Sequence, residues 1–495
     1  MSNANDQVSA VERLHTGVPG LDRILGGGFF KSGVYMVQGL PGCGKTILAN
    51  QICYSHVAQG GAAIYVTLLA ESHSRMIQHI STLSFFDIKA FPDHLSYISA
   101  FHELEADGLK GLMSVLRREM KSSRVGILVL DGLVTAAEAA PTDLELKKFI
   151  HELQGIAELH ECTVLLLTSG YTHRMAAEHT MVDGIIEVED KLFDARSERS
   201  IQVRKFRGAG PLRGKHAMRI DHDGISIFPR IEALYGGPSI PVTRTEAVPS
   251  GIPTLDRLLG IGGIPRASAT VAIGSTGTGK TTMGIHFLAA STAQEPGLHL
   301  GFFEAPDRLR AKARSIGHPL EQLEADGVIE LLWQSPGEFM LDEIGDRVLN
   351  AVDRLGARRL VIDGLSGFLD SALYPERINR YFSCLVNELR NRQVTIFMAL
   401  ETRDVVASVV SMPWGVSGLV DNLFFLRFVH EEAQVERLLT IIKMRDTDHH
   451  AELRRIEIDG TGLQVCDLLA ADGDVIPAAV PLPASKVNPE NDPAS

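Results

Sequence analysis

The chain carries the same nucleotide-binding motif twice, and this duplication constrains its fold more than any other feature. The first copy is Gly39-Leu-Pro-Gly-Cys-Gly-Lys-Thr46 and the second is Gly274-Ser-Thr-Gly-Thr-Gly-Lys-Thr281, both matching G-x-x-x-x-G-K-[ST]. An apolar run of strand length precedes each copy, 34–38 in one case and 269–273 in the other, and a helix-like run follows each. Strand, glycine-rich turn and helix is the context in which this motif binds phosphate. The sequence therefore predicts two phosphate-binding loops.

The residue types in these loops indicate ATP and Mg²⁺ as ligands. The glycines let backbone N–H groups point at an anionic phosphate, and the helix N-terminus adds positive potential. The lysine can reach the β- and γ-phosphates, and the threonine hydroxyl can bind Mg²⁺. The predicted nucleotide-binding residues are Gly39, Gly42, Cys43, Gly44, Lys45 and Thr46 in the first loop and Gly274, Thr276, Gly277, Thr278, Gly279, Lys280, Thr281 and Thr282 in the second.

Other segments repeat in the same order as the loops. The stretch 16–26 recurs at 250–260, Asp131 recurs as Asp363 at the end of an apolar run, and the Lys-x-Arg segment 205–207 recurs at 443–445. All repeat at separations close to the 235 residues between the two loop lysines, which indicates a duplicated domain. We expect a polar, frayed N-terminus at 1–14, domains at 15–236 and 237–466, and a disordered Pro- and Ala-rich tail at 467–495.

Within each copy, apolar runs alternate with amphipathic stretches. The runs 63–67, 126–130 and 163–168 are continuously apolar, which is typical of parallel strands buried on both faces, and 109–118 has helical periodicity. This pattern predicts an α/β fold in each half, with a doubly wound, mostly parallel sheet flanked by helices. Ligands of such sheets bind at the C-terminal ends of the strands.

Four acidic residues lie where a phosphate site needs carboxylates. Asp131 and Asp363 each end an apolar run, so both are candidates to hold Mg²⁺ together with Thr46 and Thr281. Glu71 and Glu304 each follow the next strand along the chain and could orient or deprotonate an attacking water. The alternatives are an aspartate that opens a turn and a glutamate in a solvated loop.

Composition excludes several other classes of protein. The formal net charge is −13, which argues against nucleic acid as the main ligand because phosphate contacts require Lys and Arg. The five cysteines form no C-x-x-C pair, so neither a zinc site nor a disulfide framework is indicated. No apolar run approaches 18 residues and the first residues are polar, so we expect a cytoplasmic protein without a membrane span.

Taken together, these motifs resemble the KaiC family, RecA-like ATPases built from two fused copies. The resemblance covers the chain from Thr16 to about Gln464. It implies a homohexamer of tandem RecA-like P-loop domains, with ATP between neighbouring subunits and unidentified regulatory protein partners. It also implies that four cations reach the neighbour's γ-phosphate, namely Lys205, Arg207, Lys443 and Arg445.

Two departures from the family pattern bear on activity. The adjacent glutamates of the family are reduced here to Glu71 after alanine and Glu304 before alanine. The family's clock protein accepts phosphate on a neighbouring serine and threonine, whereas here only Ser417 occupies that place, beside Gly418. The resemblance therefore implies an ATPase, with serine autokinase activity at Ser417 as an open alternative to an ordinary loop serine.

Two further hypotheses remain at this point. One is a DNA-dependent ATPase of the RecA/DnaB type, which the acidic balance and the lack of a basic loop run disfavour. The other is a nucleotide-gated signalling scaffold that does not hydrolyse ATP, which the reduced glutamate pairs favour.

Overall fold

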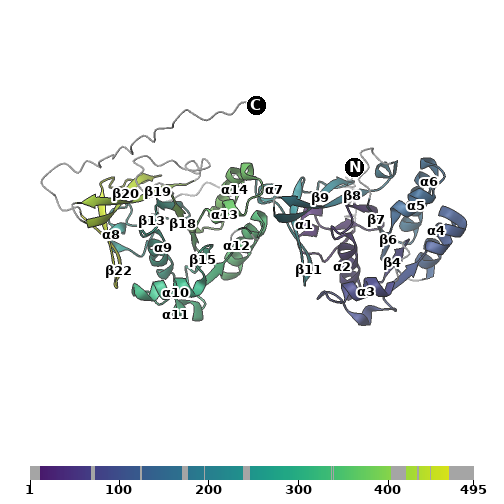
Figure 1. The fold of residues 1–495 in the computed structure, drawn as a ribbon, viewed down its shortest axis with the longest axis horizontal. Coiled ribbons are helices and arrows are strands. Elements are labelled where there is room, and N and C mark those ends of the chain that lie inside the picture. The colour runs from purple at the N-terminus through teal and green to yellow at the C-terminus, as the bar shows by residue number, and fades with distance from the viewer. Residues whose placement is uncertain are drawn as a thin grey trace, which may run out of the picture. The chain divides into compact units, whose positions relative to one another are not determined.

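A computed structural model of the chain shows two compact units, residues 1–236 and 237–495 (Figure 1). The structure describes residues 12–68, 73–122, 125–169, 177–193, 195–237, 246–335, 337, 339–402, 420–431, 434–445 and 447–467. Each unit is built around one nine-stranded sheet.

The first sheet combines a parallel part with an antiparallel extension. Its strands lie in the order β11 (Gly224–Phe228), β10 (Lys215–Asp221), β9 (Arg196–Phe206), β8 (Gly184–Phe193), β3 (Val34–Gln38), β7 (Thr163–Thr168), β6 (Ile127–Asp131), β4 (Ala63–Thr67) and β5 (Leu95–Ser99). From β5 to β8 all neighbours pair in parallel, whereas β9, β10 and β11 continue the sheet as antiparallel strands. A separate two-stranded ribbon joins β1 (Arg13–Leu14) to β2 (Phe29–Phe30).

The second sheet repeats this arrangement strand for strand. Its order is β16 (Ile329–Trp333), β15 (Gly297–Gly301), β17 (Arg359–Asp363), β18 (Thr395–Glu401), β14 (Ala269–Gly274), β19 (Asn422–Glu431), β20 (Gln434–Met444), β21 (Arg454–Asp459) and β22 (Gly462–Cys466), with the short ribbon β12 (Ala247–Val248) and β13 (Ile264–Pro265) beside it. The first six strands pair in parallel and the last three antiparallel. The predicted fold, two tandem RecA-like α/β domains with mostly parallel sheets, is confirmed.

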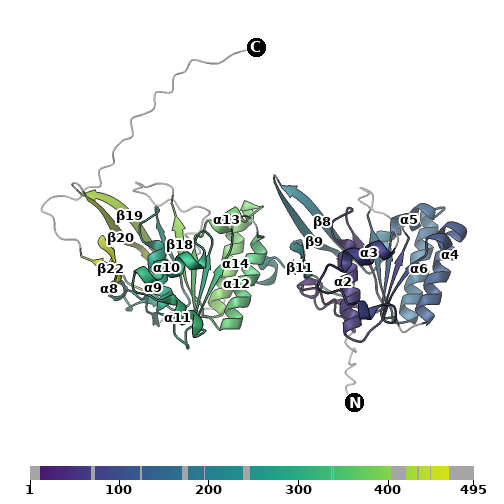
Figure 2. The ribbon, with the colours of Figure 1, turned by 60° about the horizontal axis from the view of Figure 1, so that its bottom comes forward.

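Helices cover both faces of each sheet (Figure 2). The first unit contains α1 (Leu21–Leu25), α2 (Lys45–Ala58), α3 (His73–Ile80), α4 (Phe101–Ser122), α5 (Leu133–Ala139), α6 (Asp143–Leu159) and α7 (Ile231–Leu234), with 3₁₀ turns η1 (Ile88–Ala90) and η2 (Ala177–Thr180). The second contains α8 (Pro253–Asp256), α9 (Lys280–Ala289), α10 (Pro306–Ser315), α11 (Leu320–Ala325), α12 (Leu341–Leu355), α13 (Gly367–Asp370) and α14 (Ile378–Asn391), with the 3₁₀ turn η3 (Pro375–Arg377).

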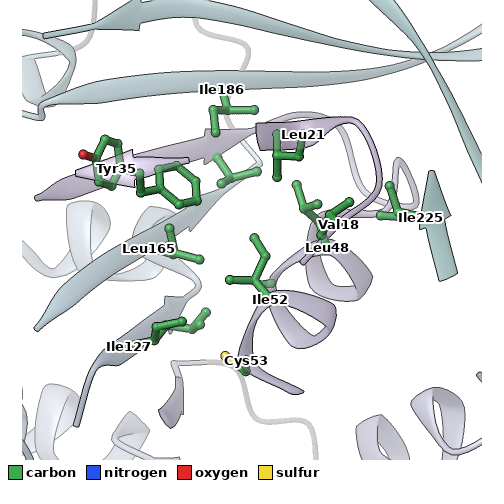
Figure 3. Close-up of a cluster of buried hydrophobic side chains, with 14 of the residues drawn as sticks. Val18, Leu21, Tyr35, Leu48, Ile52, Cys53, Ile127, Leu165, Ile186 and Ile225 are labelled. Atoms are coloured by element: carbon green, nitrogen blue, oxygen red, sulfur yellow. The ribbon is translucent and has the colours of Figure 1, made fainter. Parts of the chain in front are cut away.

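The buried strands divide their side chains between two apolar layers, as residues of a strand do when they alternate between the faces of a sheet. Along β6, Ile127 and Val129 belong to the cluster that packs against α2, whereas Leu128 and Leu130 belong to the cluster that packs against α4, α5 and α6. Figure 3 shows the first cluster, in which Ile52 of α2 lies among side chains of the strands. This two-sided burial explains why the strands read as continuous apolar runs.

Element bounds agree closely with the sequence pattern around the loops. The runs at 34–38, 63–67 and 163–168 are strands over the expected residues. The helix after each loop begins at the loop lysine itself, at Lys45 in α2 and at Lys280 in α9. Within the part of the chain that the structure describes, no helix combines the length and apolar character needed to cross a bilayer.

The two units differ in one buried link between the loop helix and the last strand of the sheet. In the first unit, the Gln51 side chain accepts from the Ile225 N–H (2.7 Å) and donates to the Ile225 carbonyl (3.1 Å). In the second unit His286 holds this place, five per cent exposed, and its Nε2 accepts from the Leu463 N–H at 2.8 Å. Its Nδ1 lies 3.2 Å from the Gly251 carbonyl and 2.9 Å from Nε2 of His318.

This histidine makes the second unit sensitive to acid. Burial and the neighbouring His318 lower the pKa of His286 to about 4, and an unfolded histidine titrates near 6.5. Below pH 6.5 this histidine therefore takes up a proton in the unfolded chain but stays neutral in the folded chain. Its contribution to stability is complete above pH 6.5 and falls toward pH 4. The shift corresponds to a loss of about 3 kcal/mol at pH 4.

We expect His286→Gln, which installs the residue of the first unit, to reduce the fall in melting temperature between pH 6.5 and 4, with the remainder coming from groups such as the buried His299, whose pKa burial also lowers to about 4. Thermal unfolding across this range checks the prediction against wild type. His450→Gln, at an exposed histidine, serves as the matched control and should leave the wild-type slope unchanged. Equal slopes for wild type and His286→Gln would contradict the assignment.

Candidate nucleotide sites

The two glycine-rich loops have the same backbone conformation. Each lies between the central strand, β3 or β14, and the helix that follows it. Gly42 and Gly44 have φ of 85° and 109°, and their counterparts Gly277 and Gly279 have φ of 84° and 107°. A side chain is strained in this left-handed region, which explains why glycine stands at all four positions, although the motif itself specifies it only at 44 and 279. The loops are thus two copies of one phosphate-binding geometry.

The loop lysines fold back over their own loops. Nζ of Lys45 donates to the carbonyls of Gly39 (2.7 Å) and Leu40 (2.9 Å). Nζ of Lys280 donates in the same way to the carbonyls at 274 and 275, both at 2.7 Å. Burial lowers the pKa of Lys280, which is eight per cent exposed. Each ammonium group is therefore held at the concave side of its loop, where a phosphate of the nucleotide is expected.

A hydroxyl and a carboxylate meet beside each loop. Oγ1 of Thr46 lies 3.4 Å from Oδ2 of Asp131, and Oγ1 of Thr281 lies 3.3 Å from Oδ1 of Asp363. Burial raises the pKa of Asp363. The hydrogen bond from Thr281 and the charges of Lys312 and Lys280 act in the opposite direction and lower it in part. Hard oxygen ligands of this kind suit Mg²⁺, which commonly uses one or two carboxylates and retains several waters. The residues present therefore fit the expected ion at both sites.

Of the two candidate glutamates, the structure places only Glu304. Oε1 of Glu304 lies 3.8 Å from Nζ of Lys312 on α10, and Oε2 is buried without a hydrogen-bond partner among the described residues. A buried carboxylate oxygen of this kind is available to a water or a hydroxyl group. Glu71 and Ser417 lie outside the described residues.

The Lys-x-Arg pairs lie at the opposite end of the central strand from the loop of their own unit. Asp183 connects the start of β3 to the Lys-x-Arg segment of the first unit. Its Oδ2 accepts from the N–H of Val34, the first residue of β3, and its carbonyl accepts from the Arg207 N–H. Nζ of Lys205 donates to the carbonyls of residues 179 and 180, both at 3.1 Å. The loop begins beyond the other end of β3, about 16 Å away for five residues of strand.

The second unit repeats this arrangement. Oδ2 of Asp421 accepts from the N–H of Ala269 at the start of β14, and the Arg445 N–H donates to the Asp421 carbonyl. Nζ of Lys443 donates to the carbonyl of Val420 at 2.9 Å. In neither unit do these cations approach their own phosphate loop. Each pair therefore lies away from the loop of its own unit.

Sequence reasoning missed four side chains around the loops. Tyr65 donates to Asp131 and Asn50 to the Thr46 carbonyl in the first unit, while Lys312 acts electrostatically on both Lys280 and Asp363 in the second. Glu401, at the end of β18, accepts from the Thr276 hydroxyl of the second loop. The one available signal was a tyrosine inside an otherwise apolar strand beside the strand of Asp131.

Comparison with known proteins supports one family. A family model described as "ATPase: KaiC" matches residues 14–232 and again 248–470. The circadian clock oscillator protein KaiC of Picosynechococcus sp. is 24% identical over 482 residues, which cover 94% of this chain and 92% of that protein. The circadian clock protein KaiC2 of Synechocystis sp. is 24% identical over 487 residues, which cover 95% and 84%. The KaiC of Acaryochloris marina is 25% identical over 475 residues, which cover 92% and 88%. With two matched regions that each contain a phosphate loop and a strand-tip aspartate, the chain belongs to the KaiC family of ATPases.

Proposed function

We propose that the protein is a Mg²⁺-dependent ATPase that assembles as a homohexamer and hydrolyses ATP between neighbouring subunits. The observation that carries this proposal is the position of Arg207 and Arg445. Each lies near the end of the central strand that is opposite to its own loop, and its side chain is 55% exposed in Arg207 and 45% exposed in Arg445. A cation supplied by a neighbour stabilises the charge that develops on the transferred phosphoryl group.

Each remaining side chain has a role in this proposal. Lys45 and Lys280 bind the β- and γ-phosphates, and the Thr46–Asp131 and Thr281–Asp363 pairs hold Mg²⁺, which neutralises phosphate charge when it is bound. Glu304, and Glu71 at the first site, orient the water that attacks the γ-phosphorus and accept its proton. Lys312 keeps a positive charge beside Glu304 before the nucleotide enters.

The alternatives predict different behaviour. A DNA-dependent motor requires a basic binding surface, which the net charge of −13 disfavours. A scaffold that binds ATP without hydrolysis is compatible with one glutamate per site. An ATP turnover assay with and without Mg²⁺, repeated with single-stranded DNA at several salt concentrations, separates the three. We expect slow turnover that requires Mg²⁺ and does not respond to DNA.

We further propose that autophosphorylation, where the second site performs it, modifies Ser417 with Glu304 as the base. The serine hydroxyl attacks the γ-phosphorus, its proton passes to Glu304, and ADP leaves. The product adds a charge of about −1.5 to −2. Only one acceptor is present, because Gly418 follows Ser417.

Incubation with γ-labelled ATP should therefore mark wild type and the control Ser411→Ala but not Ser417→Ala. Label that persists in Ser417→Ala, or that never enters wild type, removes the kinase step. The ATPase proposal is unaffected by either outcome, because turnover is measured separately.

A further inference from the structure

A polar network lies beneath the first phosphate site, on buried elements. Tyr65 of β4 donates its hydroxyl to Oδ2 of Asp131 at 2.8 Å, the same oxygen that Thr46 contacts. Asn50 of α2 donates to the Thr46 carbonyl at 2.8 Å and accepts from the Tyr97 hydroxyl at 2.8 Å. The rings of Tyr65 and Tyr97 contact each other, with centroids 5.6 Å apart. Both Thr46 and Asp131 are thus held by hydrogen bonds from buried side chains, Thr46 by Asn50 and Asp131 by Tyr65.

The described residues of the second site form no equivalent network. Strand register places His299 opposite Val361 as Tyr65 lies opposite Val129, and it pairs His299 with Leu331 as it pairs Tyr65 with Tyr97. The position five residues after the loop lysine, asparagine in the first unit, is Ile285 in the second. Among the residues that the structure describes, His299 makes no hydrogen bond to Asp363, whose carboxylate takes a hydrogen bond from the Thr281 hydroxyl and is influenced electrostatically by Lys280 and Lys312.

We propose that Tyr65 is a positioning residue for the Mg²⁺ site of the first unit, where it raises the affinity for Mg²⁺, and that the second site has no equivalent of it among the described residues. The inference rests on the proposed function and adds a difference between the two sites. A hydrogen bond from a buried phenol fixes the rotamer of Asp131 and so keeps the carboxylate beside the Thr46 hydroxyl before the ion arrives. Outer partners that orient a metal-binding carboxylate typically change metal affinity by 10- to 100-fold.

The Tyr65 hydroxyl is the donor in its hydrogen bond to Asp131. Burial and the Asp131 charge raise the pKa of Tyr65 well above 10, so its hydroxyl stays protonated. Tyr65 is fully buried and Asn50 is fully buried as well, which leaves water little chance to replace either group. The network is therefore a preformed part of the fold.

The test uses the full-length chain with Lys280→Ala, so that only the first site binds nucleotide. A fluorescent ATP analogue is titrated at increasing Mg²⁺ in this parent and in the parent with Tyr65→Phe, which removes only the hydroxyl. In the Tyr65→Phe variant we expect the Mg²⁺ concentration that gives half of its maximal effect on binding of the analogue to rise about tenfold. Affinity measured in EDTA should stay the same, because the loop contacts to phosphate are unchanged.

Two further variants separate positioning from stability. Tyr35→Phe removes another buried hydroxyl of the same sheet, bonded to Phe30 rather than to the site, and should leave the Mg²⁺ dependence unchanged. Tyr65→His introduces the residue type of the second unit and should raise the half-maximal Mg²⁺ concentration as Tyr65→Phe does. An unshifted Tyr65→Phe, or an equal shift in Tyr35→Phe, overturns the inference. A Lys280→Ala parent whose ATP binding ignores Mg²⁺ instead contradicts the proposed function.

Discussion

The double substitution Lys45→Ala and Lys280→Ala is expected to abolish nucleotide binding, with a loss of affinity on the order of 100-fold or more. Each ammonium group is held at its own loop by two carbonyls, so the charge already lies beside the expected phosphate site before the nucleotide enters. Equilibrium binding should give two nucleotides per wild-type chain, one per single variant and none for the pair. Unchanged affinity in the double variant would contradict the site assignment.

Controls must separate lost charge from a damaged loop. Lys280 is buried, so alanine leaves a void there as well as removing the charge. Methionine at both positions keeps most of the side-chain volume and should abolish binding equally. Lys148→Ala, at an exposed lysine on α6, serves as the matched control and should bind as wild type does. Melting curves of all variants show whether the fold is intact.

The second large effect is expected from Arg207→Ala, which should lower the turnover number of the first site by about 1000-fold while ATP binding changes little. The reason is the proposed action of the guanidinium on the phosphoryl group of a neighbouring subunit, not on its own loop. The measurement uses a Lys280→Ala background, so that only the first site turns over. Arg204→Ala provides the control on the same strand, since Arg204 pairs with Glu187 at 2.9 Å.

Mixing variants tests the contribution from the neighbour directly. A subunit with Arg207→Ala keeps its loop, and a subunit with Lys45→Ala keeps its arginine, so some interfaces of a mixed hexamer combine both intact parts. In the same background, the mixture should recover activity that neither variant has alone. No recovery, or a monomer by light scattering at saturating ATP and Mg²⁺, would contradict assembly through these arginines.

The sequence predicted most of the fold because its signals are local. Phosphate loops, apolar runs and glycines at fixed spacing depend on a few neighbouring residues, and Asp131 could be placed at the site because parallel strands end at the same edge of a sheet. The duplication added certainty, since each motif was seen twice in the same order.

The remaining side chains of the site depend on contacts between distant segments. Tyr65 and Asn50 are buried polar residues whose partners come from other strands and from the loop helix, and periodicity cannot assign such partners. Lys312 of α10 acts on Lys280 and Asp363, which lie far from it along the chain. The position of Arg207 relative to its own loop likewise followed from strand pairing and not from spacing along the chain.

The separation of loop and arginine within one unit also bears on the symmetry of the proposed assembly. The phosphate loop follows the last residue of β3, and Arg207 is tied through Asp183 to its first, so a contact that joins them uses two different surfaces of the subunit. A two-fold axis would make two such contacts at once within a dimer, whereas a heterologous arrangement makes one contact for each pair of neighbours. Repeated from subunit to subunit it closes into a ring or continues as a helical filament, and in a ring every subunit both gives an arginine and receives one.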